Sequence, residues 1–312
     1  MDTRKASKAT WKHIVCSIIL LILFVLFTHN TINAEGYTGE TSKSSTSDTV
    51  PLNRNGLLSQ LSTVDNENEV EAGPKEEVTV YISDIDYYIT TYADELEFFA
   101  KTSGVRHDDI IDDLHARYVN SGIEFNELNF GFLTNEKGEY ITFDSVEYGI
   151  VEYFYDYVEK HPSKTSRTRV PYTGNAEYIE NLIIYYTTHI YTNVDSSLAL
   201  SIGASESGYY KVKTMLRVNN VFGGMSSKGL IKYHNIEYGV LSYIKLLSEK
   251  YVAKGLDTIS EIGRVYCPTY DNFGNKIASP HWMNLVKTAK KKYDLYNFNL
   301  SFEELLLNNK TA

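Results

Sequence analysis

One acidic residue, Glu206, stands at a position where a charge is normally avoided. It lies in the stretch SLALSIGASESGYY (197–210), where apolar residues recur at helical spacing. Leu198, Ile202 and Glu206 follow one another at intervals of four residues, so they share one face of the expected helix. The sequence therefore places a carboxyl group on an apolar face, just before the Ser-Gly pair that ends the helix.

Two physical effects are expected to raise the pKa of the Glu206 carboxyl. The apolar face withdraws it from water, and the partial negative charge at a helix C-terminus disfavours a carboxylate there. A carboxyl that stays protonated near neutral pH is a general acid, the role needed to protonate a glycosidic oxygen. The alternative is a surface glutamate on a differently rotated helix, or one paired with Lys211 or Lys213.

The segment after this helix, RVNNVFGG (217–224), has the composition of a tight loop. Asparagine and glycine tolerate unusual backbone angles, and asparagine side chains both donate and accept hydrogen bonds, which suits sugar hydroxyls and N-acetyl groups. The alternative for the two asparagines is a simple turn. Tyr209, Tyr266 and Trp282 lie in or near this region, and aromatic faces stack on sugar rings, although core packing is the alternative for such side chains.

Together these segments carry a family resemblance. The pattern ALSIGASESGYY … NNVFGG resembles the ESG helix and NN-x-FG signature of bacterial endo-β-N-acetylglucosaminidases of glycoside hydrolase family 73, which are lysozyme-like enzymes that cut the peptidoglycan backbone. The later stretch VYCPTYDNFGNKIASPHWMNLV (265–286) resembles their C-terminal region, where a cleft tyrosine is followed by a tryptophan-bearing helix. The resemblance covers residues from about 178 to 296.

The resemblance implies roles for individual residues. It implies that Glu206 is the catalytic acid and that Tyr266 is the cleft tyrosine, which we take as a further candidate catalytic residue. It further implies a sugar-binding cleft, to which we assign Tyr209, Asn219, Asn220, Phe222 and Trp282.

The second catalytic group has no clear counterpart. Many family members carry a carboxylate on the hairpin after the NN-x-FG loop, but the corresponding stretch MSSKGLIKYHN (225–235) has no acid. Glu237 follows it at a helix start, and Asp271 is our candidate near the cleft tyrosine, although Thr269 holds the family's usual aspartate position. Attack by the substrate N-acetyl group, or a lytic transglycosylase that uses Glu206 alone, needs no second carboxylate. A non-catalytic peptidoglycan-binding or scaffold module is a further alternative.

The N-terminus predicts export. The apolar run IVCSIILLILFVLF (14–27) follows Arg4, Lys5, Lys8 and Lys12, as in an export signal or a membrane anchor. We expect an extracytoplasmic protein held by a single-pass anchor, or alternatively one cleaved after Ala34 and secreted to the cell wall. Export without a disulfide framework fits a Gram-positive bacterium.

Residues 1–34 are therefore expected to be the anchor or signal peptide, and the polar residues 35–77 a disordered tether. A helical region, 78–165, comes next; it is a candidate degenerate repeat, and the alternatives for its role are extension of the catalytic groove or binding of a protein partner. The expected catalytic domain is 170–300, with a tail at 301–312. The fold class is mainly α (α+β): a lysozyme-like helical domain with a small β-hairpin lobe, preceded by a helical N-terminal region.

Helical patterns and end signals locate the expected elements. Asp195 or Ser196 can cap the helix that carries Glu206, and Gly208 can end it. Two hairpins are expected, at 135–143 and 226–234. The other expected helices cover 86–104, 107–122, 145–161, 176–193, 236–252, 257–267 and 280–296.

Two segments resemble each other, which suggests a duplicated hairpin–helix unit. In the first of them Tyr118 falls roughly where Glu206 lies in the second, and chance similarity is the alternative. The paired stretches are Phe130-Gly131 with Phe222-Gly223, Lys137-Gly138 with Lys228-Gly229, and Val146–Ile150 with Ile236–Val240.

Charge and composition exclude other classes. The formal net charge of −10 argues against a nucleic-acid partner, since such proteins normally present a basic face. The two cysteines and eight scattered histidines form no metal-binding motif. We expect no metal ion and no cofactor. The expected partners are peptidoglycan glycan strands and, through the apolar N-terminal segment, a membrane.

Overall fold

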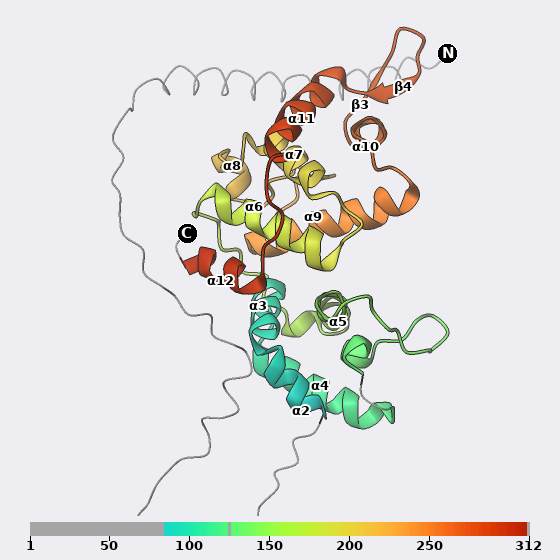
Figure 1. Ribbon diagram of the computed structural model, residues 1–312, viewed down its shortest axis with the longest axis vertical. Coiled ribbons are helices and arrows are strands. Elements are labelled where there is room, and N and C mark those ends of the chain that lie inside the picture. Colours follow the sequence, from blue (N-terminus) through green and yellow to red (C-terminus); the bar gives the residue numbers. More distant parts are fainter. Residues whose placement is uncertain (1–83, 124–125, 311–312) are drawn as a thin grey trace, which may run out of the picture. The chain divides into compact units, whose positions relative to one another are not determined.

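The described part of the chain is mainly helical, as predicted (Figure 1). The computed structural model describes residues 84–123 and 126–310, which belong to one compact unit. Within these residues, no helix is both long enough and apolar enough to cross a membrane. The predicted anchor and tether lie outside the described residues.

The first group of elements precedes the connection that ends near residue 175. It consists of α2 (Asp84–Thr91), α3 (Ala93–Ser103), α4 (His107–Ser121), the 3-10 segment η2 (Glu127–Phe132), α5 (Val146–Lys160) and the 3-10 turn η3 (Pro162–Lys164).

The second group carries the predicted catalytic region. Its first half is α6 (Ala176–Tyr185), the π-helical turn η4 (Tyr186–Ile190), α7 (Ser196–Ser207), α8 (Lys213–Leu216) and the antiparallel strands β1 (Met225–Ser226) and β2 (Gly229–Leu230). Its second half is α9 (Ile236–Lys250), the 3-10 turn η5 (Val252–Lys254), α10 (Ile259–Tyr266), the antiparallel strands β3 (Pro268–Tyr270) and β4 (Lys276–Ala278), α11 (Pro280–Tyr293) and α12 (Phe302–Lys310).

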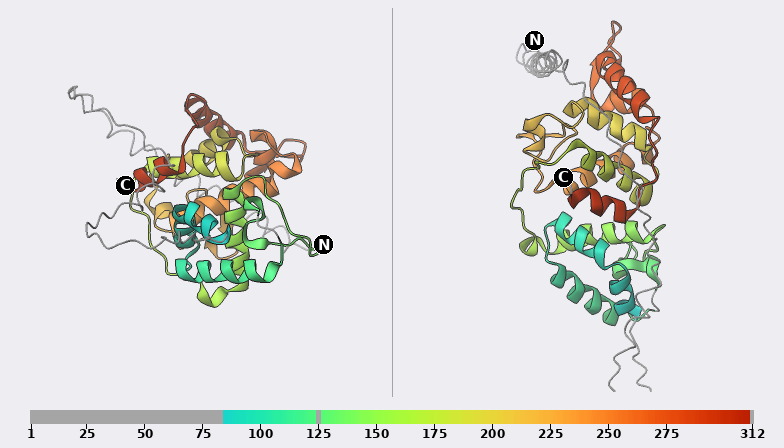
Figure 2. Two further views of the ribbon diagram at one scale, coloured as in Figure 1. Left: turned by 60° about the horizontal axis from the view of Figure 1, so that its bottom comes forward. Right: turned by 60° about the vertical axis from the view of Figure 1, so that its left-hand side comes forward.

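Several boundaries differ from those expected. The helix predicted for 86–104 is divided at Tyr92 into α2 and α3. The hairpin predicted for 135–143 forms a hydrogen-bonded turn, in which Asn135 N donates to Glu139 O, but its strand pairing is limited to the bridge between Thr134 and Tyr140. The β3–β4 hairpin was not anticipated. The predicted tail at 301–312 instead contains α12, which lies against α6 in both Figures 1 and 2.

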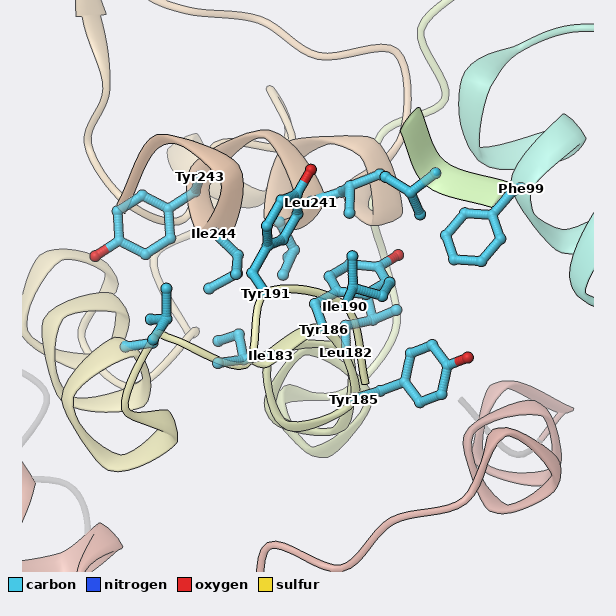
Figure 3. Close-up of a cluster of buried hydrophobic side chains, with 14 of the residues drawn as sticks. Phe99, Leu182, Ile183, Tyr185, Tyr186, Ile190, Tyr191, Leu241, Tyr243 and Ile244 are labelled. Carbon is cyan, nitrogen blue, oxygen red and sulfur yellow. The ribbon is translucent and has the colours of Figure 1, made fainter. Parts of the chain in front are cut away.

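The core between α6 and α9 is made of aliphatic and tyrosine side chains. Figure 3 shows Ile183 and Tyr186 facing Leu241 and Ile244 of α9, and all four are fully buried or nearly so. Phe99 of α3 joins the same cluster, with its ring centroid 6.4 Å from that of Tyr186. The first helical group is therefore packed on the second through a shared apolar core, which stabilises both by removing apolar surface from water.

Helix α7 is buried along most of its length, because residues 196–204 are all inaccessible. Its predicted ends are confirmed: the Asp195 side chain accepts a hydrogen bond from Leu198 N at 2.6 Å, and Gly208 has a φ of +58°. Helix α7 therefore has no exposed polar face, in contrast to the single apolar face that the sequence predicted. Helices on several sides cover α7, and only its last turn reaches partial exposure.

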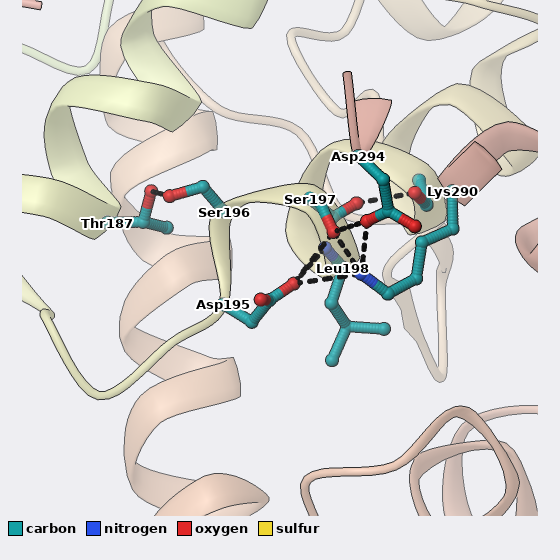
Figure 4. A network of polar contacts seen from close by, with 8 residues as sticks. Thr187, Asp195, Ser196, Ser197, Leu198, Lys290 and Asp294 are labelled. Atoms are coloured by element: carbon teal, nitrogen blue, oxygen red, sulfur yellow. Dashed lines mark hydrogen bonds and ion pairs between the residues drawn. The ribbon is translucent and has the colours of Figure 1, made fainter. Parts of the chain in front are cut away.

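Helix α11 runs antiparallel to α7 and is joined to it at both ends. At the start of α7, Ser197 Oγ lies 2.7 Å from the Asp294 carboxylate, and Lys290 contacts Ser197 and Asp294 (Figure 4). At the other end, Trp282 of α11 meets Glu206. The two helices are thus fixed against each other over their whole contact.

The two segments that resemble each other share local contacts. Helices α5 and α9 have the same length. In each, the side chain of the N-cap residue accepts a hydrogen bond from the backbone N–H three positions later in the chain. Phe130 contacts Tyr153 of α5 at 5.3 Å between ring centroids, and Phe222 contacts Tyr243 of α9 at 3.5 Å. These parallels support the hypothesis of a duplicated unit.

In the first segment a cation, Arg117, lies beside Gly131, which matches Gly223 in the sequence. Arg117 of α4 donates to Gly131 O at 3.3 Å and lies 5.1 Å from the centroid of the Tyr153 ring. It also forms ion pairs with Asp113 and Asp156. Tyr118 was expected roughly at the position that corresponds to Glu206, and the side chain that contacts Gly131 is that of the preceding residue, Arg117.

Two matched glycines test this packing. An added Cβ at Gly239 of α9 would lie 2.0 Å from Asn219 O, whereas at Gly149 of α5 it would meet the Phe130 side chain at 3.0 Å. We expect Gly239→Ala to lower the free energy of unfolding by about 1–3 kcal/mol or more, since backbone cannot yield. Gly149→Ala should cost less, because the added methyl group would meet the Phe130 side chain at 3.0 Å and not a backbone oxygen at 2.0 Å, while both variants gain the same helix propensity of about 1 kcal/mol. Urea unfolding followed by circular dichroism measures both, and equal stabilities would contradict the packing.

Candidate active site

The Glu206 carboxyl lies at the end of α7 and is half-buried. Its Oε1 accepts a hydrogen bond from Trp282 Nε1 at 2.8 Å. Within residues 84–123 and 126–310, no other side chain hydrogen-bonds to this carboxyl and no cation pairs with it. The alternative of a surface ion pair with Lys211 or Lys213 is therefore not formed.

Burial raises the pKa of Glu206 to about 7, against an ordinary value of 4.5. The cause is loss of water around the charged form, and the hydrogen bond from Trp282 acts in the opposite direction by stabilising the carboxylate. At neutral pH a large fraction of the carboxyl groups therefore keeps its proton. Such a group can give a proton to a bound oxygen and then exist as a carboxylate held by the indole.

The second carboxyl oxygen, Oε2, faces the loop after α8. Gly223 has a φ of +68°, and a Cβ there would lie 2.8 Å from Glu206 Oε2. A side chain at this position would be strained by its backbone and would push into the carboxyl group. Glycine therefore keeps this side of Glu206 clear.

Asn219 and Asn220 hold this loop from inside the protein. Asn219 donates to Val170 O and Tyr233 O at 2.9 and 3.1 Å, and its oxygen accepts from Tyr172 N at 3.0 Å. Asn219 is fully buried and Asn220 nearly so. The prediction that the Asn219 side chain contacts sugar is therefore wrong, since its donors are already used by backbone carbonyls.

Asn220 acts in the same way on the other side of the loop. Its amide donates to Gly224 O at 2.8 Å and Ile231 O at 2.9 Å, and its oxygen accepts from Gly224 N at 3.1 Å. These bonds join the loop to the end of the β1–β2 hairpin. Asn220 therefore fixes the path of the loop instead of binding a ligand, which corrects the prediction of a sugar contact.

Phe222 is buried and links the loop to two helices. Its ring stacks on Tyr243 of α9, and a Cβ at Gly203 of α7 would lie 2.6 Å from its edge. The predicted direct role in sugar binding is therefore also wrong for Phe222. The packing of Phe222 instead fixes the backbone of the next residue, Gly223, beside the Glu206 carboxyl group.

Tyr266 is brought to the site, as the sequence predicted. Its hydroxyl donates to Phe222 O, and its ring lies 5.6 Å from that of Trp282 between centroids. Burial, and then the charge of Glu206, raise the pKa of Tyr266. The phenol therefore stays protonated at neutral pH, and it is a hydrogen-bond donor that ties the loop to α10.

Neither Trp282 nor Tyr209 presents a fully exposed ring face on which a sugar could stack. The Trp282 side chain is buried, and it serves as the donor to Glu206, which corrects its predicted role as a sugar contact. Tyr209 is half-buried with a φ of +56°, and Lys292 Nζ lies 5.3 Å from its ring centroid. Tyr209 thus keeps partial exposure at the end of α7, where a ligand contact stays a prediction.

The two candidate partners of Glu206 are engaged elsewhere. Asp271 accepts hydrogen bonds from Phe273 N, Asn275 N and the Asn275 side chain, which close the β3–β4 turn. These bonds lower the pKa of Asp271, so it suits a turn and not an acid or base poised near neutral pH. Glu237 accepts a hydrogen bond from Tyr178 at 3.0 Å. A catalytic role for Asp271 therefore stays a prediction, and its carboxylate is used by the β3–β4 turn in this structure.

Tyr243 is a residue that sequence reasoning missed. Its hydroxyl is buried, and nothing in the described part of the chain hydrogen-bonds to it. Burial and then the charge of Glu206 raise the pKa of Tyr243, so the phenol is neutral beside the carboxyl. The repeat could have drawn attention to it, because Tyr153 and Tyr243 fall at the same place in the matched stretches 146–153 and 236–243. In the structure Tyr153 also lies against a carboxylate, with a hydrogen bond to Asp113 at 2.9 Å.

No family model, curated protein or solved structure matches the chain. The site is therefore characterised by its own geometry: one carboxyl with a pKa near neutrality, one indole donor, and two neutral phenols. This arrangement can donate a proton and can stabilise the resulting negative charge.

The raised pKa predicts how stability changes with pH. The pKa of Glu206 is 4.5 in the unfolded chain, its ordinary value, but about 7 in the folded protein. The folded state therefore holds more protons in between, and its stability falls as pH rises through this interval. At about 1.4 kcal/mol per pH unit, Glu206→Gln should gain up to about 3 kcal/mol over the wild type between pH 4.5 and pH 7.

Chemical denaturation at a series of pH values measures this difference. Glu261→Gln is the control with the opposite sign, because hydrogen bonds from Thr258 lower the pKa of Glu261. A stability difference between Glu206→Gln and wild type that stays constant across the interval would show that Glu206 ionises normally.

Proposed function

We propose that this chain is a peptidoglycan hydrolase that cleaves the glycan backbone next to N-acetylglucosamine. In this proposal it is an endo-β-N-acetylglucosaminidase, with Glu206 as the general acid and a lysozyme-like helical catalytic domain over 170–300. The observation that carries the proposal is the carboxyl of Glu206, half-buried on the end of an otherwise buried helix, with its pKa raised to about 7. The resemblance of the ESG and NN-x-FG segments supplies the substrate class.

The proposed chemical step begins with a protonated Glu206. The proton passes to the glycosidic oxygen as the bond to the anomeric carbon breaks. The hydrogen bond from Trp282 Nε1 stabilises the carboxylate that forms after proton transfer. It also offsets part of the effect of burial, so the pKa of Glu206 is about 7 and not higher.

The second catalytic group is assigned to the substrate. Neither Asp271 nor Glu237 is paired with Glu206, and Tyr243 and Tyr266 are held neutral by burial, so neither phenol serves as a nucleophile. The N-acetyl oxygen of the substrate can attack the anomeric carbon itself, as in substrate-assisted glycosidases. Glu206 then acts as the base that activates water in the second half of the reaction.

Lytic transglycosylation is the second candidate, and the same observation favours it. A single acid that becomes a base after the first step can deprotonate the sugar's own hydroxyl instead of a water molecule. The products then differ, because transglycosylation leaves a 1,6-anhydro ring and hydrolysis leaves a reducing end.

The proposed location is outside the cytoplasm, with the N-terminal apolar segment 14–27 in the membrane and the polar tether holding the folded unit near the wall. Peptidoglycan glycan strands are the proposed partner. This placement follows from the sequence of residues 1–77.

Digestion of purified peptidoglycan tests the proposal. Glu206→Gln keeps the size of the side chain but has no proton to donate, so the rate should fall by about 10²–10⁴-fold. Glu237→Gln is the matched control, since Glu237 contacts Tyr178 and not Glu206. It should retain most of the wild-type rate.

Mass spectrometry of the fragments decides between the candidates. Reducing-end N-acetylglucosamine is expected from the proposed hydrolase, and 1,6-anhydro-muramic acid would replace it with the transglycosylase. Undiminished digestion by Glu206→Gln would remove Glu206 from the mechanism. Wild-type binding to peptidoglycan without any released fragment would favour a non-catalytic module.

A further inference from the structure

A cavity of about 310 Å³ lies where the first helical group meets α9. Its walls come from α3, α5, the connection before α6, the segment between β2 and α9, and the first turn of α9. Neither Glu206 nor the residues placed around it line this cavity, so it is separate from the candidate active site.

Three cationic side chains line the cavity: Arg167, Arg169 and Lys232. Each of them is exposed, and among the described residues none forms an ion pair. The chain as a whole carries a formal charge of −10, so three unpaired cations around one hollow are a local reversal of the protein's charge. Electrostatic attraction to an anion is the direct consequence.

The backbone that carries the two arginines is fixed on both sides. Ser166 N donates to Gly104 O at 2.7 Å, and Val170 N donates to His234 O at 2.8 Å. Gly104 leaves no room for a side chain, since a Cβ would lie 2.5 Å from Ser166 O. The guanidinium groups are therefore carried by a segment that is ordered before any ligand arrives, which reduces the entropy lost on binding.

The inner wall is aromatic and polar. Tyr233 and Tyr238 line it, with His234 between them in the sequence. Burial raises the pKa of Tyr238, and the positive charge of Arg167 acts against it, as expected for a guanidinium near this phenol. His234 Nε2 lies 2.5 Å from Thr102 O, and burial lowers the pKa of His234, so this ring is neutral.

The acidic group that acts on this wall is Glu237, whose charge raises the pKa of His234 against the effect of burial. Its carboxylate is held by the Tyr178 hydroxyl at 3.0 Å. Glu237 does not line the cavity. The excess of positive charge at the cavity therefore remains.

We infer that this cavity binds a sugar phosphate, with Arg167, Arg169 and Lys232 around the phosphate and the tyrosine wall against the sugar. Guanidinium groups match phosphate oxygens in paired hydrogen bonds, and three cations suit a doubly charged anion better than a single carboxylate. The aromatic wall suits the apolar face of a sugar ring. The volume leaves space beyond a phosphate group alone.

Calorimetric titration of the full chain with glucose 6-phosphate, inorganic phosphate and glucose tests the inference. Glucose 6-phosphate should bind more tightly than either of the other two. Arg167→Gln and Arg169→Gln should each weaken it by about tenfold or more, because each loses charge-assisted hydrogen bonds. Arg217→Gln is the matched control, since Arg217 is also exposed but does not line the cavity. It should leave the affinity nearly unchanged.

Failure of this inference is distinct from failure of the proposed enzyme function. Glu206→Gln should bind glucose 6-phosphate as the wild type does, whether or not the chain cleaves peptidoglycan. No heat of binding at millimolar glucose 6-phosphate would overturn the inference. Equal weakening by Arg217→Gln would show non-specific attraction, and inorganic phosphate binding as tightly as glucose 6-phosphate would exclude the sugar.

Discussion

The antiparallel contact between α7 and α11 determines the geometry of the candidate active site. Lys290 of α11 and Asp294, which caps its end, hold the start of α7 through Ser197, and Trp282 holds the last turn of α7 through Glu206. Because both ends are joined to the same helix, the carboxyl group cannot move independently of the indole that donates to it. The packing around the end of α7 then leaves a charge on the half-buried Glu206 poorly solvated, and the raised pKa is the result.

The loop of residues 219–224 forms the other side of the site, and its polar side chains hydrogen-bond to backbone groups that fix the conformation of the loop. The asparagine amides bind backbone carbonyls, and the stacked pair of Phe222 and Tyr243 places Gly223 against the carboxyl. The first segment keeps a related aromatic pair but presents Arg117 to its loop. Similar aromatic packing thus lies next to Glu206, which has no ion-pair partner among the described residues, in one segment, and next to Arg117, paired with Asp113 and Asp156, in the other. This difference fits duplication followed by loss of an acid.

The sequence predicted the features that depend on local spacing. Helix α7, its Asp195 cap and its end at Gly208 follow from period and capping, which are properties of neighbouring residues. The burial of α7 on every side, in place of the single apolar face that was expected, depends instead on the elements packed around it. The sequence could not predict which distant groups share hydrogen bonds. Asn219 offers the same donors to a sugar or to a carbonyl, and only the fold brings Val170 and Tyr233 to it. Docking of α12 on α6 likewise depends on tertiary contact, not on pattern.

The central claim is that the fold holds Glu206 as a protonated acid near neutral pH. Titration of its side-chain carboxyl by carbon NMR tests this most directly, with the signal assigned by its absence from Glu206→Gln. The account predicts a midpoint at about 7. A midpoint at or below the ordinary value of 4.5 would contradict it, because the apolar environment and the indole would then have left a carboxylate that cannot donate a proton.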